Sequence, residues 1–348
     1  MIELDGTYEE GGGQIVRTAL GLSAFTGKAF TVANIRQGRK EPGLKKQHLE
    51  AVRALQKLCN AKVEGAELGS QSITFEPTTF KPQKLEIDIE TAGSITLLLQ
   101  SLIVPMIFAK KKTTLIIKGG TDVSHSMPAD YFKYVFLPHL NKYGNIEFKI
   151  IKRGYYPKGN GMVEFSISPK ENKQQIILVE QGKLSHIKGV AHASARLQKR
   201  NVAERMAEAA RLELQKLHSP VNIETHYSET LSDGAGITLW SLHSTTDEVD
   251  YLNPIILGAD KLGELKVSAE DVALVCAKQL IEEINSHAAV DRHLTDNLIP
   301  LVGIVGGKIK VSEISKHTLA NIYVTEKFLD VKFNVDFNKK EISVVRQQ

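Results

Sequence analysis

The sequence predicts a mixed α/β (α+β) fold, in which a large domain of three repeated βα units carries a small inserted α/β domain. The first observation is an order of elements that occurs three times: an apolar helix, a strand, a polar turn, a second helix and two further strands. The second is spacing, because equivalent helix ends lie roughly 84 and then roughly 196 residues apart. The third is that the excess residues, 185–275, follow a different pattern.

The first unit is predicted from its helical and strand periodicities. A helix at 14–25 ends at Gly27, the residue type favoured just past a helix C-terminus. A strand is expected at 29–35, followed by a second helix with one apolar face and by two more strands. The residues that mark this helix and these strands are Leu49, Val52, Leu55, Leu58, Lys62 and Ile73.

The second and third units repeat this order. In the second unit we expect helices at 94–108 and 131–143 and strands at 113–117, 146–151 and 162–167. In the third we expect helices at 296–305 and from about 317 to 328, and strands at 308–314, 331–337 and 341–345.

The insertion reads as a small α/β domain of its own. A strand at 187–192 precedes a long amphipathic helix at 201–217, and strands at 221–225 and 237–242 follow. Ser268-x-x-Asp271 resembles a capping box that starts the helix returning to the main body. The predicted domains are therefore a large one, residues 1–184 with 276–348, and an inserted one, residues 185–275.

Composition and charge limit the class of protein. The formal net charge is only +4, yet five lysines and arginines lie between residues 34 and 46 against one acid, Glu41. Such a local excess indicates a discrete anionic partner, for example a nucleotide or the end of a nucleic acid. The apolar run at 95–108 is too short to span a bilayer, and two cysteines exclude a disulfide framework. We expect no membrane association and a cytoplasmic protein, or a nuclear one if the source is eukaryotic.

The glycine run near the N-terminus carries the clearest chemical signal. Glu9-Glu10 is followed by three glycines and then by a helix that contains Arg17. Glycines let a backbone approach a ligand closely, and a helix N-terminus presents free N–H groups to an anion. A neighbouring carboxylate can hold a divalent cation. The pattern predicts a polyphosphate site with metal, although an ordinary glycine-rich turn would also fit it; it is not a Walker loop.

Several motifs, spread over essentially the whole chain, together resemble the RNA 3′-terminal phosphate cyclase family. They are Glu-Gly-Gly-Gly-Gln with Arg17, Ile-Arg-x-Gly-Arg at 35–39, Pro-Gly-Leu at 42–44, Gln-His-Leu at 47–49, Glu-Leu-Gly-Ser-Gln at 67–71, Gly93-Ser94 with Gln100, Gly-Gly-Thr-Asp at 119–122, and Arg-Gly-Tyr-Tyr-Pro-Lys-Gly-Asn-Gly at 153–161. The last departs from the family signature, because Asn160 stands where a glycine is usual.

The resemblance implies a fold, an activity and a nucleophile. The family fold is similar to the one the repeats predict. Family members use ATP, with a divalent metal (Mg or Mn), to convert a 3′-phosphate at an RNA end into a 2′,3′-cyclic phosphodiester through a histidine–AMP intermediate. By this resemblance the nucleophile is His317, in Ser315-Lys-His-Thr-Leu-Ala-Asn321. A neutral imidazole can attack the α-phosphorus, and a strand-to-helix turn offers donors for a phosphate.

The resemblance also implies roles for other residues of this chain, each at a position that matches the family's motif. Glu10 is similar to the family's metal-contacting carboxylate. The expected phosphate- and RNA-end-binding groups are Arg17, Arg36, Arg39 and Gln47. The expected nucleotide contacts are Gln100, Pro128, His293, Leu294, Thr295, Asp296 and Asn297. The family often has tyrosine in place of His293 and glutamine in place of Asn297; an imidazole can still stack on adenine, with less area than a phenol ring.

Two other functions remain open from the sequence. One is a non-catalytic, cyclase-like RNA-binding factor of ribosome assembly; His317 argues against it, because that branch lacks the nucleophile. The other is an enolpyruvyl-transferase-type enzyme built from similar repeats, against which the small insertion and the histidine turn argue.

Overall fold

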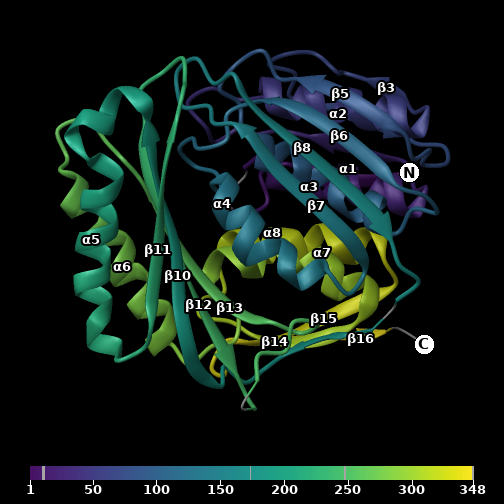
Figure 1. Cartoon of the computed structure of the whole chain (residues 1–348). Helices are drawn as coiled ribbons and strands as arrows, with labels where there is room; N and C mark the ends of the chain where they lie inside the picture. The colour runs from purple at the N-terminus through teal and green to yellow at the C-terminus, as the bar shows by residue number, and fades with distance from the viewer. Residues whose placement is uncertain (10–11, 173, 247, 347–348) are drawn as a thin grey trace.

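The computed structural model describes residues 1–9, 12–172, 174–246 and 248–346. Within them, the predicted α/β class and the repeated architecture are confirmed: four sheets of four strands each are present, one for every repeated unit and one for the insertion. Figure 1 shows the sheets of the three units arranged around a central group of helices, with the inserted unit at one side.

Each repeated unit runs β-α-β-α-β-β. The first unit contains β1 (Ile2–Asp5), α1 (Gln14–Thr26), β2 (Phe30–Ala33), α2 (Lys46–Cys59), β3 (Lys62–Glu64) and β4 (Ile73–Glu76). The second contains β5 (Lys84–Asp88), α3 (Ile95–Ile107), β6 (Thr113–Gly119), α4 (Ala129–Tyr131), β7 (Gly144–Lys152) and β8 (Gly161–Pro169). The third contains β9 (Ile176–Leu178), α7 (Arg292–Val305), β14 (Gly307–Lys310), α8 (Lys316–Phe328), β15 (Val331–Asp336) and β16 (Glu341–Arg346).

The three sheets share one topology. Their strand orders are β1-β2-β4-β3, β5-β6-β8-β7 and β9-β14-β16-β15. In each sheet the first two strands are parallel and the other pairings are antiparallel. The sequence patterns did not predict β5 and β9, which open their units as edge strands of five and three residues. Edge strands this short carry too few alternating residues to show a period of two.

The second helix of the second unit differs most from expectation. In place of one helix at 131–143, α4 is a single turn, continued by a π-helix at Phe132–Phe136 and a 3₁₀ helix at Leu137–Leu140. Pro138 lies in the first turn of the 3₁₀ segment, and proline has no N–H to donate to a continuing α-helical ladder.

The central helices form the main core. α1 packs against α2, α3 and α8, and α7 packs against α8. α1 and α3 approach closely at Gly21, where a Cβ atom would lie only 3.0 Å from the carbonyl oxygen of Ser101. Almost every residue of α3 is buried, as its all-round apolar sequence predicts. The described part of the chain has no helix of the length and apolar character needed to cross a membrane.

The inserted unit has its own sheet and its own core. Its main elements are β10 (Lys183–Ser194), α5 (Val202–Leu214), β11 (Val221–Ser228), β12 (Ala235–Ser244), β13 (Ile255–Leu262) and α6 (Ala269–Asn285). The strand order is β11-β10-β12-β13, and α5 and α6 pack on the outer face of this sheet (Figure 1). The predicted boundary at residue 275 falls inside α6, whose apolar side chains belong to the second core up to Ile284. We propose that the inserted unit extends to about residue 285, because the whole helix packs with it.

Asp291 joins the inserted unit to the repeated units. It is fully buried at the N-terminus of α7, where its Oδ1 accepts hydrogen bonds from the backbone N–H groups of His293 and Leu294 at 2.9 and 2.8 Å. The Tyr131 hydroxyl donates to Oδ1 at 2.6 Å, and the Gly258 N–H donates to Oδ2 at 2.8 Å. One carboxylate therefore fixes α7, α4 and the edge strand β13 relative to one another.

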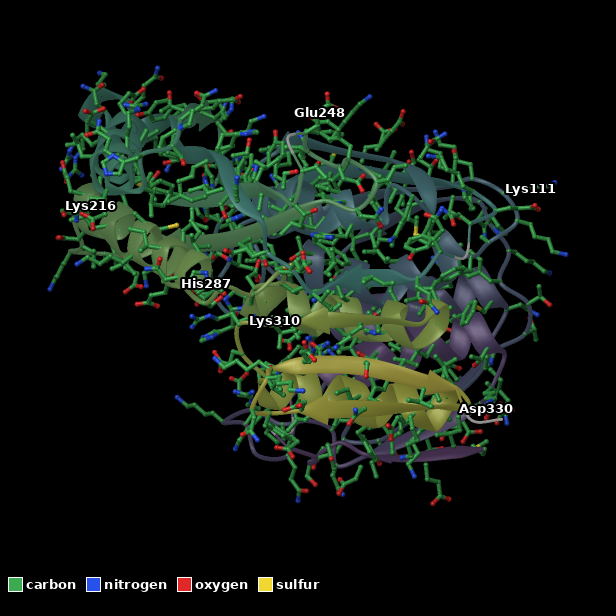
Figure 2. The ribbon with its side chains drawn as sticks, turned by 90° about the horizontal axis from the view of Figure 1, so that it is seen from below. Lys111, Lys216, Glu248, His287, Lys310 and Asp330 are labelled. Atoms are coloured by element: carbon green, nitrogen blue, oxygen red, sulfur yellow. The ribbon has the colours of Figure 1, made fainter. Side chains whose placement is uncertain are left out.

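Substitution of Asp291 tests this joint. Asp291→Asn keeps the size of the side chain and a good helix N-cap, but its NH₂ group must face a buried N–H or O–H donor that the carboxylate had accepted. Leaving buried donors unsatisfied costs about 1–3 kcal/mol, so the midpoint of urea unfolding should fall accordingly. Asp330→Asn, at an exposed site that Figure 2 labels, is the control. Equal midpoints for the two variants would show that the joint does not contribute to stability.

Candidate active site

A cleft of about 570 Å³ lies where the units meet. It is lined by residues of all three repeated units and by one residue of the inserted unit, Asp260. The lining residues are Gly12, Gly13, Gln14, Arg17, Arg36, Arg39, Lys45, Gln47, His48, Leu97, Gln100, His125, Ser126, Met127, Asp260, His293, Asp296, Asn297 and His317. The cleft thus gathers most of the site residues that the sequence predicted.

His317 lies in the first turn of α8, close to Gly12. Ser315 caps this helix, because its hydroxyl accepts a hydrogen bond from the Thr318 N–H at 3.0 Å. A Cβ atom at Gly12 would lie 3.8 Å from Cε1 of His317 and 3.5 Å from a guanidinium nitrogen of Arg39. The imidazole and the Arg39 guanidinium therefore approach the same stretch of backbone from two different units.

Asp296 holds the turn that carries His317. Its Oδ1 accepts hydrogen bonds from the hydroxyls of Ser315 and Thr318, at 2.9 and 2.7 Å. Burial raises the pKa of the Asp296 carboxyl, while these hydrogen bonds and the nearby His317 oppose the rise. Asn321 completes the link by donating to the Asp296 carbonyl oxygen at 2.7 Å. Asp296 thus lines the cleft and also fixes the start of α8.

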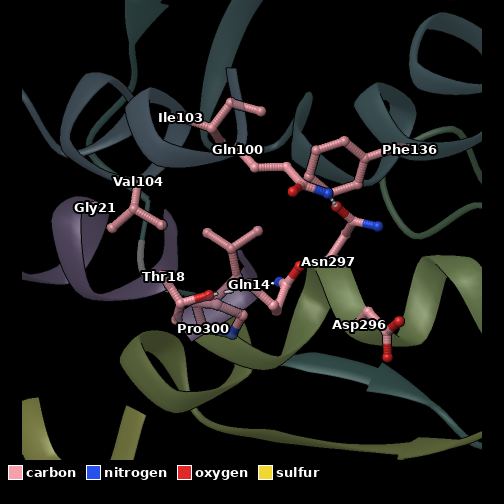
Figure 3. A pocket seen from close by; sticks show the side chains of 11 residues that line it. Gln14, Thr18, Gly21, Gln100, Ile103, Val104, Phe136, Asp296, Asn297 and Pro300 are labelled. Carbon is pink, nitrogen blue, oxygen red and sulfur yellow. Dashed lines mark hydrogen bonds between the residues drawn. The ribbon is translucent and has the colours of Figure 1, made fainter. Parts of the chain in front are cut away.

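A polar chain connects α1, α3 and α7 across the floor of the cleft. Arg17 donates from Nε to Oε1 of Gln100 at 2.8 Å and from Nη2 to Oε1 of Gln14 at 2.5 Å. Gln100 in turn donates to Oδ1 of Asn297 at 2.7 Å. Figure 3 shows this last contact, between α3 and α7, beside a small cavity of about 30 Å³. Because each side chain is held by its neighbours, the guanidinium of Arg17 has a defined position.

One end of the cleft concentrates positive charge. Arg17, Arg36, Arg39 and Lys45 all line it. Burial, and then the charge of Arg36, lowers the pKa of Arg17 to about 10. Burial, and then the charge of Arg39, lowers the pKa of Arg36. Cations that depress one another's pKa are stabilised by a bound anion, so this end suits a phosphate or polyphosphate.

His48 extends this basic end, and the sequence reasoning did not select it. Its Nδ1 accepts the backbone N–H of Lys45 at 3.1 Å, which leaves the proton on Nε2 of the neutral ring. Burial, with the charges of Arg17 and Arg36, lowers the pKa of His48 well below its usual value and keeps it neutral. Nε2 lies 3.5 Å from Nη1 of Arg17, so two N–H donors meet where an anion could accept from both.

Of the remaining predicted residues, some line the cleft and others do not. Gln47 lines the cleft, and its Oε1 accepts the backbone N–H of Ser94 at 2.8 Å, which joins α2 to the start of α3. Pro128 precedes α4 next to the lining residue Met127 and is not itself part of the lining. Leu294 and Thr295 are fully buried and also do not line the cleft. The structure therefore brings Gln100, His293, Asp296 and Asn297 of the predicted nucleotide-binding set into the cleft.

The predicted metal site lies partly outside the described residues, because Glu10 is one of those the structure does not describe. Among the described residues, one group of acidic and histidine side chains comes close enough to hold an ion: Asp122, Asp130 and His192. Arg153 already pairs with both carboxylates, at 3.2 and 2.7 Å. A second cation there would face this guanidinium, so the group is an ion-pair cluster between units and does not fit a metal.

Comparison with known proteins identifies the family. A model of the RNA 3′-terminal phosphate cyclase family matches residues 8–335. The chain belongs to this family. RNA 3′-terminal phosphate cyclase of Pyrococcus furiosus is 44% identical over 351 residues, covering 100% of this chain and 99% of the relative. The proteins of the same description from Methanosarcina barkeri and Pyrococcus abyssi are 44% and 42% identical, over 98% and 97% of this chain and 98% and 95% of the relatives. The resemblance drawn from the motifs is confirmed.

The glycine run of this cyclase-family chain gives a matched pair of substitutions. A Cβ atom at Gly13 would lie 2.3 Å from Nε2 of buried His48, so Gly13→Ala should displace the ring and cost about 1–3 kcal/mol. Gly12→Ala meets nothing nearer than 3.5 Å and should leave stability unchanged. Thermal unfolding of both variants is the measurement. A Gly13→Ala protein as stable as the wild type would mean that this backbone does not pack against His48.

Proposed function

We propose that the chain is an ATP-dependent RNA 3′-terminal phosphate cyclase that works through a histidyl-AMP and an RNA-adenylate. Family membership supports the overall activity. The observation that carries the mechanism is the shared cleft, which His317 lines together with Arg17, Arg36 and Arg39. A nucleophile next to a polyphosphate-sized basic end is the arrangement that nucleotidyl transfer needs.

In the first step a neutral His317 nitrogen attacks the α-phosphorus of ATP. A P–N bond forms, the bond to the bridging oxygen breaks, and pyrophosphate leaves with the electron pair. Arg17, held by Gln14 and Gln100, would bind the negative charge that develops on the phosphates. His48 would donate from Nε2 to the same anion.

In the second step an oxygen of the RNA 3′-phosphate attacks the AMP phosphorus and His317 leaves. This forms a phosphoanhydride between the RNA end and AMP. In the third step the neighbouring 2′-hydroxyl attacks the 3′-phosphorus, loses its proton and expels AMP, which leaves the 2′,3′-cyclic phosphodiester. The nucleophile and the phosphorus belong to one ribose, so orientation supplies most of this step.

The divalent metal remains part of the proposal. Glu10 is the residue predicted to hold it, and such an ion would supply further charge neutralisation at the phosphates. RNA with a 3′-phosphate end is the proposed partner, and the basic loop with Arg36 and Arg39 is its proposed binding region. The cytoplasmic location predicted from the sequence stays a prediction.

Family membership and the cleft also bear on the two alternatives. A non-catalytic assembly factor would need no nucleophile, whereas here a capped helix presents His317 to the cleft. An enolpyruvyl transferase would not be expected to match a cyclase family model along most of its length. Both observations support the cyclase.

The nucleophile is tested by His317→Ala. The variant should lose covalent label from α-phosphate-labelled ATP, and cyclisation should fall by at least about a thousandfold, because no other group takes the AMP. His226→Ala, an exposed histidine on β11, is the control and should label normally. A folded His317→Ala protein that still forms an acid-labile, alkali-stable adduct would mean that another residue is the nucleophile.

The RNA end is tested by Arg39→Lys. Arginine can bind a terminal phosphate through two parallel hydrogen bonds that lysine does not reproduce. AMP loading of the protein should stay near normal, while transfer from preformed adduct to a 3′-phosphorylated oligonucleotide should slow about tenfold or more. Single-turnover chase experiments measure both steps, with the exposed Arg53→Lys as control. Transfer at the wild-type rate, or a defect already at the ATP step, would contradict this role.

A further inference from the structure

The edge strand of the inserted unit forms part of the cleft wall. β13 is the last strand of its sheet, and its Gly258 N–H donates to Asp291 at the start of α7. A Cβ atom at Gly258 would lie 2.6 Å from the ring of Tyr131, so only glycine lets β13 approach α4 this closely. The position of this strand relative to α7 is therefore tightly defined.

The alternation of side chains along β13 directs Asp260 into the cleft. Leu257 and Ala259 belong to the core of the inserted unit, and Ile256 belongs to the main core. Because side chains two residues apart share one face of a strand, Gly258 and Asp260 lie on the face that Ile256 presents to the main body. Asp260 is accordingly the lining residue that the inserted unit contributes to the cleft.

The surroundings of Asp260 leave its carboxylate available to a ligand. Burial raises its pKa to about 6, and the nearby His293 opposes the rise. The other leading effects are neighbouring charges, and no hydrogen bond is among them. Near neutral pH the group is mostly ionised in a partly buried position, where it would gain from a hydrogen-bond donor.

The charges in the cleft indicate which part of a nucleotide lies there. Phosphates belong at the arginine end of the cleft, because an ionised carboxylate at the other end would repel them. The charges that act most on Asp260 are those of His293, Asp291, Asp122 and Lys261, and none of the cleft arginines is among them. His293, in the first turn of α7, has its ring 6.2 Å from that of Tyr131 in an edge-on arrangement, and it also lines the cleft. The uncharged base of a nucleotide is the group that fits this end.

We propose that Asp260 reads the base of the bound nucleotide by accepting a hydrogen bond from the 6-amino group of adenine. This inference rests on the proposed use of ATP and assigns to the inserted unit a part in choosing the nucleotide. This role makes Asp260 a specificity-determining residue, since neither His317 nor a cleft arginine is among the charges that act most on it. Its removal should change which nucleotide binds and leave the nucleophile in place.

Calorimetric binding to the full-length protein tests the proposal without requiring turnover. The probes are α,β-methylene analogues of ATP and of purine ribonucleoside triphosphate, which lacks only the 6-amino group. The wild type should bind the adenine analogue about tenfold more tightly than the purine analogue, as expected for a hydrogen bond to an ionised group. Asp260→Asn and Asp260→Ala should both reduce this ratio, and for Asp260→Ala it should approach one. Asp330→Asn, an exposed control, should keep it.

Three results of these binding measurements would overturn the proposal. A ratio that the Asp260 variants leave unchanged would show that the carboxylate does not contact the amino group. If the wild type bound the α,β-methylene analogue of GTP more tightly than that of ATP, the base would present another edge to Asp260. If Asp260→Ala weakens binding of the purine analogue but does not weaken binding of 2′-deoxy or 3′-deoxy analogues of ATP, the residue binds the ribose. Failure of the proposed function looks different: selective binding would persist while His317 took no label from ATP.

Discussion

The arrangement of this molecule depends on one buried carboxylate. Asp291 caps α7, accepts the Tyr131 hydroxyl and holds the edge strand of the inserted unit through Gly258. Together with the ion-pair cluster that joins His192 to Asp122 and Asp130, this joint places the sheet of the insertion against the repeated units. His293 and Asp296 follow on the same helix, and Asp260 follows Gly258 by two residues. The position of the cleft wall is therefore coupled to the capping of a single helix, which links fold to site.

Charge divides the cleft into two ends with different tasks. The arginines, Lys45 and neutral His48 offer donors to phosphates, whereas His293 and Asp260 offer an aromatic ring and an acceptor to a base. His317 belongs to a capped turn that Asp296 holds by hydrogen bonds to Ser315 and Thr318. A nucleotide that follows this division has its phosphates at the basic end and its base against the inserted unit. The function we propose needs this orientation, because only an α-phosphorus near His317 can react.

Many elements of the fold could be predicted from the sequence, because their patterns lie within a few neighbouring residues. The periodicities and Gly27 predicted α1, which the structure confirms. The family resemblance of the motif around His317 implies a nucleophile, and the structure places that motif at the start of α8. The short edge strands β5 and β9 had too little pattern. The apolar spacing predicted one helix at 131–143, where the chain instead forms a π-helix and then a 3₁₀ helix with Pro138 in its first turn. His48 and Asp260 could not be selected, since their roles depend on Lys45, Arg17, Gly258 and Asp291 meeting through the tertiary fold.

A crystal structure of the protein with an α,β-methylene analogue of ATP tests the proposed orientation of the nucleotide most directly. The phosphates should lie against Arg17 and His48, the base between His293 and Asp260, and the α-phosphorus about 3–3.5 Å from a ring nitrogen of His317. An analogue bound in the reverse direction, with its base at the arginines, would contradict the division of the cleft. An analogue bound outside the cleft would show that the repeated units and the inserted unit do not together build one nucleotide site.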